Sequence, residues 1–428
     1  MNHEKIFRYI GITAIVLLFF GLGGWYLFLR GQTASVESAS AARGFSVGIP
    51  AFLGSRGSTA ANIESGTGKS GASTFSKILG LGGLRSDATD EEKGDSARAN
   101  DTRPPRLWRA SNIPVAGISF TNSSTTNLRY VERSTGHVFD VNPVTGNVVR
   151  KTNTLTPRVY EAHIGPFDTV VERALNESDV VQTIAGKIGT TTKDGLAQLN
   201  MKEIGTPLSA LASSRSTSDL LILADASVGS RLLRTKWDGT APKQLATIPA
   251  GEFTVLWPSE SRIILLESPA SGLMGSALTV TTTITPLVRG FGLMILPHPS
   301  HTALLYSTDD GRTISLFARP AQSSVITLPI RTVAEKCVWT PGKNSIAFCA
   351  VPQADPGALF VDRWYRGEAH TEDAWYRVDA GAGTAEKYFS IDGAAIDVEH
   401  PVMDDRGEYI AFMNARDKSL WILRVSEK

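Results

Sequence analysis

A short unit of strand, polar turn and strand recurs from about residue 106 to the C-terminus, and it constrains the fold more than any other feature. The clearest copy joins Cys337–Trp339 to Ile346–Ala350 across a polar turn, and Pro401–Met403 with Tyr409–Met413 repeats it. The second strands of the remaining copies start at Leu128, Thr169, Leu220, Ile263 and Ala303. Most intervals are about 40 to 50 residues, a spacing typical of β-propeller blades made of four short strands.

The second strand of each unit is apolar on both faces, as in Ile263–Leu266. Such strands suit the inside of a blade that is covered by a neighbouring blade on each side, because a sheet with one solvated face would alternate apolar and polar residues. A helical repeat would show a period of about 3.6 residues instead. The sequence therefore predicts an all-β domain over residues 106–428, a seven-bladed β-propeller, although six or eight blades fit the same spacing.

The last unit ends on a third strand, Leu420–Val425, with no fourth strand after it. The missing strand is expected at the start of the domain, where Arg106–Arg109 has the right composition. We therefore predict that a strand over 106–111 pairs with the strand over 420–425. This pairing would close the ring and leave no sheet edge exposed.

Residues 10–29 are uncharged, and Thr13 is their only polar side chain. At about 1.5 Å per residue this stretch spans roughly the 30 Å hydrocarbon core of a bilayer. We predict that residues 1–30 form a cytoplasmic stub and one transmembrane helix. A cleavable signal peptide is the alternative, since small residues at 38–41 would suit a cleavage site.

Residues 31–105 are rich in Gly, Ser, Ala and Thr, which favours a disordered, flexible linker. Lys5 and Arg8 precede the apolar stretch, whereas Arg30 and Arg43 follow it, so the positive-inside rule weakly favours a cytoplasmic N-terminus. The propeller is then expected on the extracytoplasmic side of the cell membrane, as part of a single-pass protein.

A resemblance supports this organisation. The stretch Trp339–Phe348 resembles the repeat of TolB-like propellers, in which a Trp-Ser-Pro-Asp-Gly-Lys turn precedes an apolar strand, although the Asp is missing here. Residues 106–428 with the N-terminal span are similar to uncharacterised membrane-anchored TolB-like or WD-repeat-like propeller proteins of candidate-phyla bacteria. This resemblance implies fold and location, and it brings no activity and no catalytic residues.

Two features are candidate sites. The sixth unit is lengthened between Pro352 and Asp373 and carries Arg363, Trp364, Tyr365 and Arg366. Aromatic and arginine side chains on a long loop are typical of a binding surface. The alternative is that both rings fold back over the blade as a cap.

Cys337 and Cys349 form the second feature, since a symmetric hairpin places them opposite each other on adjacent strands. Opposed Cβ atoms are about 4.5–5.5 Å apart, wider than the mean of about 3.8 Å in a disulfide. We expect two close but unbonded thiols. A cross-strand disulfide remains open, and a slip of one residue would separate the two side chains.

Two other patterns give little support for a catalytic site or a metal site. Ser307–Thr313 fits most of the Asp-box turn of sialidases, but Ile314 stands where Trp is usual, and a polar hairpin turn is the preferred interpretation. His298 and His301 share a proline-containing turn, and no third metal ligand is indicated. We expect no metal, no cofactor and no catalytic residues.

The sequence thus predicts a membrane-tethered binding or scaffold module that is not an enzyme. Its partner is expected to be a protein or an envelope polymer, in addition to the membrane itself through residues 10–29. The 43 basic and 42 acidic residues nearly cancel, which argues against nucleic acid as a partner. The alternatives are an extracytoplasmic carbohydrate-active hydrolase or lyase on a propeller scaffold, and a structural envelope component.

Overall fold

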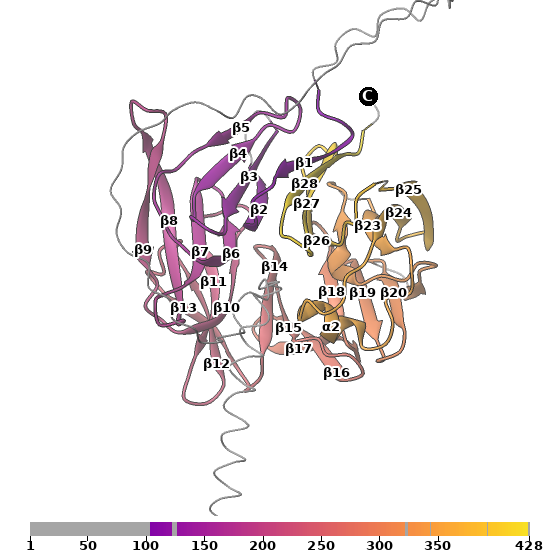
Figure 1. The fold of residues 1–428 in the computed structure, drawn as a ribbon. Helices are drawn as coiled ribbons and strands as arrows, with labels where there is room; N and C mark the ends of the chain where they lie inside the picture. Colours follow the sequence, from indigo (N-terminus) through magenta and orange to yellow (C-terminus); the bar gives the residue numbers. More distant parts are fainter. Residues whose placement is uncertain (1–102, 122–125, 322–323, 343, 392, 427–428) are drawn as a thin grey trace, which may run out of the picture. The chain divides into compact units, whose positions relative to one another are not determined.

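The computed structural model describes residues 103–426, apart from 122–125, 322–323, 343 and 392. These residues form seven antiparallel sheets of four strands each (Figure 1). The seven-bladed all-β propeller predicted from the sequence is confirmed. The predicted span at 10–29, and the linker up to residue 102, lie outside the described residues. Within the described part of the chain, no helix has the length and apolarity needed to cross a membrane.

Six blades consist of four strands that follow one another in the sequence, with the first strand innermost. Blade 1 contains β2 (Val115–Thr121), β3 (Asn127–Glu132), β4 (Val138–Val141) and β5 (Val148–Arg150). Blade 2 contains β6 (Val159–Ile164), β7 (Thr169–Leu175), β8 (Val181–Thr191) and β9 (Ala197–Glu203). Blade 3 contains β10 (Leu208–Ser213), β11 (Leu220–Asp225), β12 (Ser230–Thr235) and β13 (Lys243–Ile248).

The next three blades follow the same plan. Blade 4 contains β14 (Phe253–Ser259), β15 (Arg262–Glu267), β16 (Met274–Val280) and β17 (Ile284–Phe291). Blade 5 contains β18 (Met294–Pro297), β19 (Leu304–Asp309), β20 (Ile314–Arg319) and β21 (Ile326–Thr327). Blade 6 contains β22 (Cys337–Trp339), β23 (Ile346–Pro352), β24 (Asp373–Asp379) and β25 (Thr384–Phe389). Its innermost strand is preceded by the 3-10 helix η1 (Ala334–Lys336).

Blade 7 joins the two ends of the domain. Its strands β26 (Val398–Met403), β27 (Tyr409–Asn414) and β28 (Leu420–Arg424) are completed by β1 (Leu107–Ser111) as the outermost strand. Leu107 pairs with Leu423, and Trp108 pairs with Ile422. This is the pairing that the sequence predicts, and it uses the unpaired edge of β28 to close the ring.

The core is divided into seven apolar clusters, and each lies between two neighbouring blades. Strand β11 shows why the second strands are apolar throughout. Leu220 and Ile222 point into the cluster shared with blade 2, whereas Leu221 and Leu223 point into the cluster shared with blade 4. Because alternate side chains of a strand point to opposite faces, the apolar residues Leu220–Ala224 of β11 are all buried.

The innermost strands approach one another closely at Gly117 in β2. A Cβ atom at this position would lie 2.0 Å from the carbonyl oxygen of Ala162 in β6. Only glycine leaves room for the two backbones at this point. The sequence therefore needs a glycine where blades 1 and 2 meet near the propeller axis.

Candidate functional site

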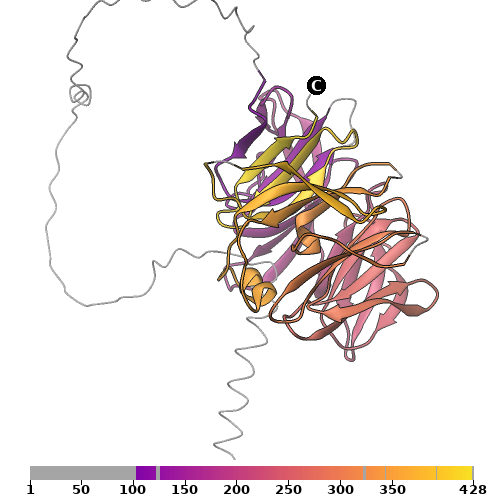
Figure 2. The same cartoon turned by 90° about the vertical axis from the view of Figure 1, so that its right-hand side faces the viewer.

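The long insertion of blade 6 carries α2 (Phe360–Tyr365), which lies near the ends of β16 and β18 in Figure 1. Figure 2 turns blades 5 and 6, with this insertion, toward the viewer. The backbone N–H of Leu359 donates to Gly311 O in blade 5 at 3.1 Å. The backbone N–H of Ser271, in blade 4, donates to Asp362 Oδ1 at 2.9 Å. The insertion is therefore tied to two other blades.

The buried carboxylate of Asp309 organises this attachment. Its Oδ2 accepts hydrogen bonds from the Ser271 hydroxyl at 2.7 Å and from the Val361 backbone N–H at 3.2 Å. Its Oδ1 accepts the N–H of Gly311 at 2.8 Å. One side chain at the end of β19 thus joins the turns of blades 4 and 5 to the first turn of α2.

The structure places the four predicted loop residues in different environments. Trp364 is buried, and its indole N–H donates to Asp397. Tyr365 is half-buried and donates its hydroxyl to Glu335 at 2.6 Å. Both rings therefore fold back onto the propeller, which is the second of the two arrangements considered from the sequence. Arg363 is half-buried, and Arg366 is exposed and paired with Glu368 at 2.9 Å.

Behind Trp364 lies a polar cluster that contains a fully buried lysine. Lys336, at the end of η1, places Nζ 2.7 Å from Asp373 Oδ2 and 2.7 Å from Thr371 Oγ1. It also contacts Asp397 Oδ1, and the three charged side chains have no exposed surface. Nζ lies 5.2 Å from the centre of the Trp364 ring, which covers the cluster.

The two aspartates have unequal surroundings. Asp397 also accepts hydrogen bonds from Trp364 Nε1 and from the Thr371 hydroxyl at 2.9 Å, and His370 Nδ1 lies 3.1 Å from its Oδ2. Burial would raise the pKa of Asp397, but the Lys336 charge and these donors outweigh burial and lower it.

Asp373 has fewer donors. Its Oδ2 accepts hydrogen bonds from Lys336 Nζ and from the backbone N–H of Val398, the latter at 2.8 Å. Its Oδ1 is buried and has no partner among the described residues. Burial raises the pKa of Asp373, the charge of Lys336 lowers it only in part, and the Asp397 carboxylate raises it further. The pKa values of the two carboxyl groups are thus shifted in opposite directions.

Sequence reasoning missed this cluster, although a signal was present. Lys336 and Asp397 both directly precede the first strand of a blade, β22 and β26. Two opposite charges at equivalent positions of consecutive repeats, each beside an apolar strand, indicate a buried ion pair between the blades. Trp364 could not be found in this way because it belongs to the insertion, which has no counterpart in the other blades, and Asp373 lies where the insertion meets β24.

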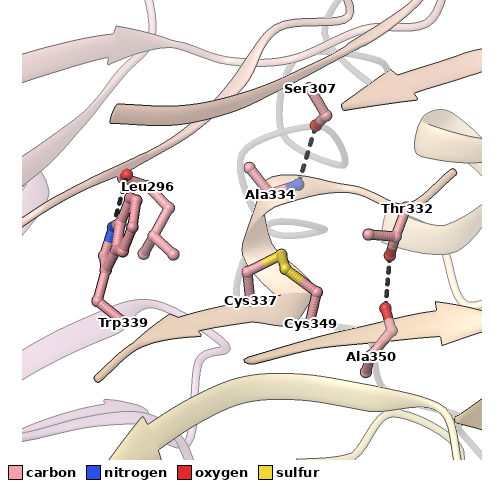
Figure 3. The surroundings of a disulfide bond; sticks show 8 residues. All are labelled: Leu296, Ser307, Thr332, Ala334, Cys337, Trp339, Cys349 and Ala350. Carbon is pink, nitrogen blue, oxygen red and sulfur yellow. Dashed lines mark hydrogen bonds between the residues drawn. A yellow bond between two sulfur atoms is a disulfide. The ribbon is translucent and has the colours of Figure 1, made fainter. Parts of the chain in front are cut away.

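Cys337 and Cys349 form a disulfide, so the expectation of unbonded thiols is wrong (Figure 3). The predicted register is confirmed, since the two cysteines face each other across β22 and β23. The N–H of Thr340 donates to Ile346 O, and the alternation of the ladder then makes the cysteines a non-hydrogen-bonded pair. In such pairs the strands approach most closely, and the Cα atoms are 4.0 Å apart. The average separation of opposed side chains, about 4.5–5.5 Å between Cβ atoms, is therefore too wide an estimate for this position.

His298 and His301 act as turn residues. Their rings stack with centroids 3.5 Å apart, and each Nδ1 accepts a backbone N–H, from Ser300 and Ala303 respectively. Burial, together with the neighbouring His301, lowers the pKa of His298 to about 4. Among the described residues, no group of His, Cys, Asp or Glu has an arrangement that could hold a metal ion.

The partial Asp box forms a hairpin turn between β19 and β20. Asp310 Oδ1 accepts the backbone N–H groups of Arg312 at 2.9 Å and Thr313 at 2.8 Å. These bonds hold the turn closed, which is the interpretation that the sequence favoured.

Three of the glutamates lie on innermost strands or in the 3-10 helix before one. Glu161 in β6 is paired with Arg173 at 2.8 Å, Glu399 in β26 is paired with Lys418 at 2.7 Å, and Glu335 in η1 accepts the Tyr365 hydroxyl. Each thus has a partner of its own.

Four large apolar side chains around the insertion are exposed, and we call them the α2 patch: Leu273 (65%), Met274 (57%), Phe291 (44%) and Leu359 (47%). Met274 pairs with Phe291 across β16 and β17, and Leu273 O accepts the N–H of Gly292. A Cβ on Gly311 would lie 3.5 Å from Leu359 Cδ2 and 3.7 Å from Gly272 Cα. The insertion therefore brings Leu359 next to the turn that carries Leu273.

No known protein family and no curated protein matches the sequence. Solved structures similar to this chain include a chain of the "Mitotic Checkpoint Complex", with 11% identity, a TM-score of 0.45, and 78% of this chain and 99% of that chain covered. YCF48 from Cyanidioschyzon merolae has 11% identity and a TM-score of 0.49, with 74% and 98% covered. The Neurospora crassa Pan2 WD40 domain has 11% identity and a TM-score of 0.46, with 74% and 90% covered. The seven-bladed assignment comes from this chain's own sheet topology.

Proposed function

We propose that this propeller is a binding or scaffold module for a protein partner, with no catalytic role. It is held outside the cell membrane by a span at residues 10–29 and a linker over 31–105. The observation that carries the proposal is the α2 patch. An envelope polymer is the alternative kind of ligand considered from the sequence.

Exposed apolar side chains that gather in one place are typical of protein-binding surfaces, whereas single exposed ones are common on any protein. Aromatic and methionine side chains are enriched at the centres of such interfaces, and the patch contains Phe291 and Met274. The hydrogen bonds that Asp309 and Asp362 accept from backbone N–H groups hold the surrounding turns in place. A preorganised surface loses less conformational entropy on binding.

An extracytoplasmic location is supported by the Cys337–Cys349 disulfide. Structural disulfides persist in oxidising compartments and are rare where thiols are kept reduced. The test is protease treatment of intact spheroplasts, which should degrade residues 106–428. Protection of this region until the cells are lysed would contradict the location.

The binding role is tested by capture from solubilised membranes. The full-length protein should retain a protein partner in stoichiometric amount, and Met274→Glu or Leu359→Glu should abolish retention. Val180→Glu is the matched control, because Val180 is similarly exposed (58%) but belongs to a turn of blade 2. Equal capture by all four proteins, or no captured protein, would contradict the proposal, and the second result would favour a structural envelope component.

A carbohydrate-active hydrolase or lyase is the second candidate. It is favoured by the carboxylates Glu161, Glu335 and Glu399 on or beside the innermost strands, since glycoside hydrolysis uses paired carboxylates. Turnover of envelope glycans by the purified protein, lost in Glu335→Gln, would support it. If the purified protein turns over no envelope glycan, the enzymatic alternative is rejected and the binding role is retained.

A further inference from the structure

We propose that Lys336 and Asp373 condense within the folded chain to form an isopeptide bond between Nζ and Cγ, with Asp397 as the proton carrier. The inference rests on the arrangement of three fully buried side chains and is independent of what the propeller binds.

The nucleophile and the carboxyl group are held together by the fold. Nζ lies 2.7 Å from Asp373 Oδ2, and the Thr371 hydroxyl and the Trp364 ring limit its movement. Reacting groups fixed at such distances behave as an intramolecular pair, and well-oriented pairs reach effective concentrations of about 10⁵–10⁸ M. Burial also excludes the water that would reverse the reaction.

The two aspartates are suited to different roles. An ionised carboxylate is a poor electrophile, and the donors around Asp397 hold it in this form. Asp373 has one oxygen without a partner among the described residues, and burial raises its pKa, so a proton passes to Asp373 more easily than to Asp397 and gives the more electrophilic carboxylic acid. The N–H of Val398 donates to Asp373 Oδ2 at 2.8 Å and holds the carboxyl group in place beside Nζ.

The step balances without any other reagent. One proton passes from the Lys336 ammonium to Asp373, which gives an amine and a carboxylic acid. Nζ then attacks Cγ, and the nitrogen loses a proton to Asp397. That proton is returned to the departing hydroxyl. The Nζ–Cγ bond forms, the Cγ–Oδ2 bond breaks, and one water molecule leaves.

The product would tie the first turn before β22 to the start of β24. The Lys336–Asp397 contact already joins blades 6 and 7, and the insertion that supplies Trp364 already joins blades 4 to 6. A covalent bond at this position would therefore fix the insertion that carries Leu359 of the α2 patch.

The experiment is mass spectrometry of the reduced and alkylated full-length protein. The wild type should be lighter than its calculated mass by one water molecule, and Lys336→Arg should have its calculated mass. After digestion with trypsin, cleavage at Lys336 should be blocked. One branched peptide should join residues 332–343 to residues 367–377.

Asp373→Asn is the most discriminating variant. Its amide would lose ammonia instead of water, so the product would have the same mass as the wild-type product. Asp397→Asn keeps both reacting groups but removes the proton acceptor, and should slow condensation at least tenfold during refolding. A wild-type protein at its calculated mass, with normal cleavage at Lys336, would overturn the proposal, as would a branched peptide containing residues 388–406, where Asp397 lies. The mass and the tryptic peptides of the wild-type protein decide the question by themselves, so the test does not depend on whether a variant folds.

Discussion

Trp364, in the insertion of blade 6, donates its indole N–H to Asp397, which directly precedes the innermost strand of blade 7. Nε1 lies 3.1 and 3.2 Å from the two carboxylate oxygens, and both side chains are buried. This contact and the Asp309 contacts join the only α-helix among the described residues to blades 4, 5 and 7. The insertion is thus part of the propeller core.

The first prediction concerns this donor. Trp364→Phe keeps an aromatic ring over Lys336 but removes the N–H, so the buried carboxylate of Asp397 loses one hydrogen bond. We expect a loss of about 1–3 kcal/mol in the free energy of unfolding, measured by denaturant titration. The matched control is Trp421→Phe, because the Trp421 N–H donates to the neutral hydroxyl of Ser419 and its ring is half-buried. An equal loss in the two variants would contradict the role of the charged acceptor.

A second prediction concerns Glu172 in β7. Its side chain is fully buried between blades 1 and 2, and neither carboxylate oxygen has a hydrogen-bond partner of good geometry among the residues that the structure describes. Burial raises the pKa of Glu172 from 4.5 to about 7, and the nearby Thr156 hydroxyl, which contacts Met201 Sδ at 3.4 Å, offsets only part of this effect.

Because the folded-state pKa is raised, the folded protein binds the proton more tightly than the unfolded chain does. The stabilising contribution is complete below pH 4.5, and it is lost as the pH rises through about 7. The loss amounts to about 3 kcal/mol, since each pKa unit corresponds to about 1.4 kcal/mol. Glu172→Gln should be insensitive to this titration. Its unfolding free energy relative to wild type should therefore rise between pH 4.5 and pH 8, and a constant difference would contradict the prediction.

A third prediction tests the close approach of blades 1 and 2. Gly117→Ala would place Cβ 2.0 Å from the carbonyl oxygen of Ala162, and a backbone atom cannot move aside as a side chain can. We expect destabilisation at or above the upper end of the usual range of about 1–3 kcal/mol for overpacking. Gly205→Ala is the control, because no atom lies within 4 Å of the added Cβ. Thermal unfolding of the two variants side by side separates the steric effect from the general effect of replacing glycine.

The fourth prediction concerns the disulfide. Cys337 and Cys349 are separated by 12 residues, and closing a loop of this length lowers the entropy of the unfolded chain by an amount worth roughly 3 kcal/mol. Replacement of both cysteines by alanine should reduce the unfolding free energy by about this amount. Addition of a reductant should then have no further effect on the variant. Alkylation of the denatured, non-reduced wild type should give no labelled cysteine, and two labels would show that the bond is absent.

The sequence was informative wherever the repeat itself determines the structure. The paired strands, the doubly apolar second strands and the closing strand follow from spacing and composition, as the burial of Leu220–Leu223 and the pairing of Leu107 with Leu423 show. The sequence was least informative at the insertion. Ser271 and Asp362 are 91 residues apart, and neither belongs to a repeated position. Whether the two cysteines are bonded depends on whether they occupy a hydrogen-bonded or a non-hydrogen-bonded position of the ladder. The sequence of the turn does not determine which of the two positions they occupy.

The fifth prediction tests ring closure. Without residues 1–111, β28 would lose its outer partner β1, and the edge of blade 7 would be exposed. The side chains of Trp108 and Ala110 would also leave the cluster between blades 7 and 1. We expect the shortened chain to unfold at lower temperature and with lower cooperativity. A synthetic peptide of residues 103–113 should restore both when added in excess, because binding to the folded state shifts the unfolding equilibrium. A scrambled peptide is the control. An unchanged thermal transition in the shortened chain, or equal rescue by the scrambled peptide, would show that β1 does not close the ring.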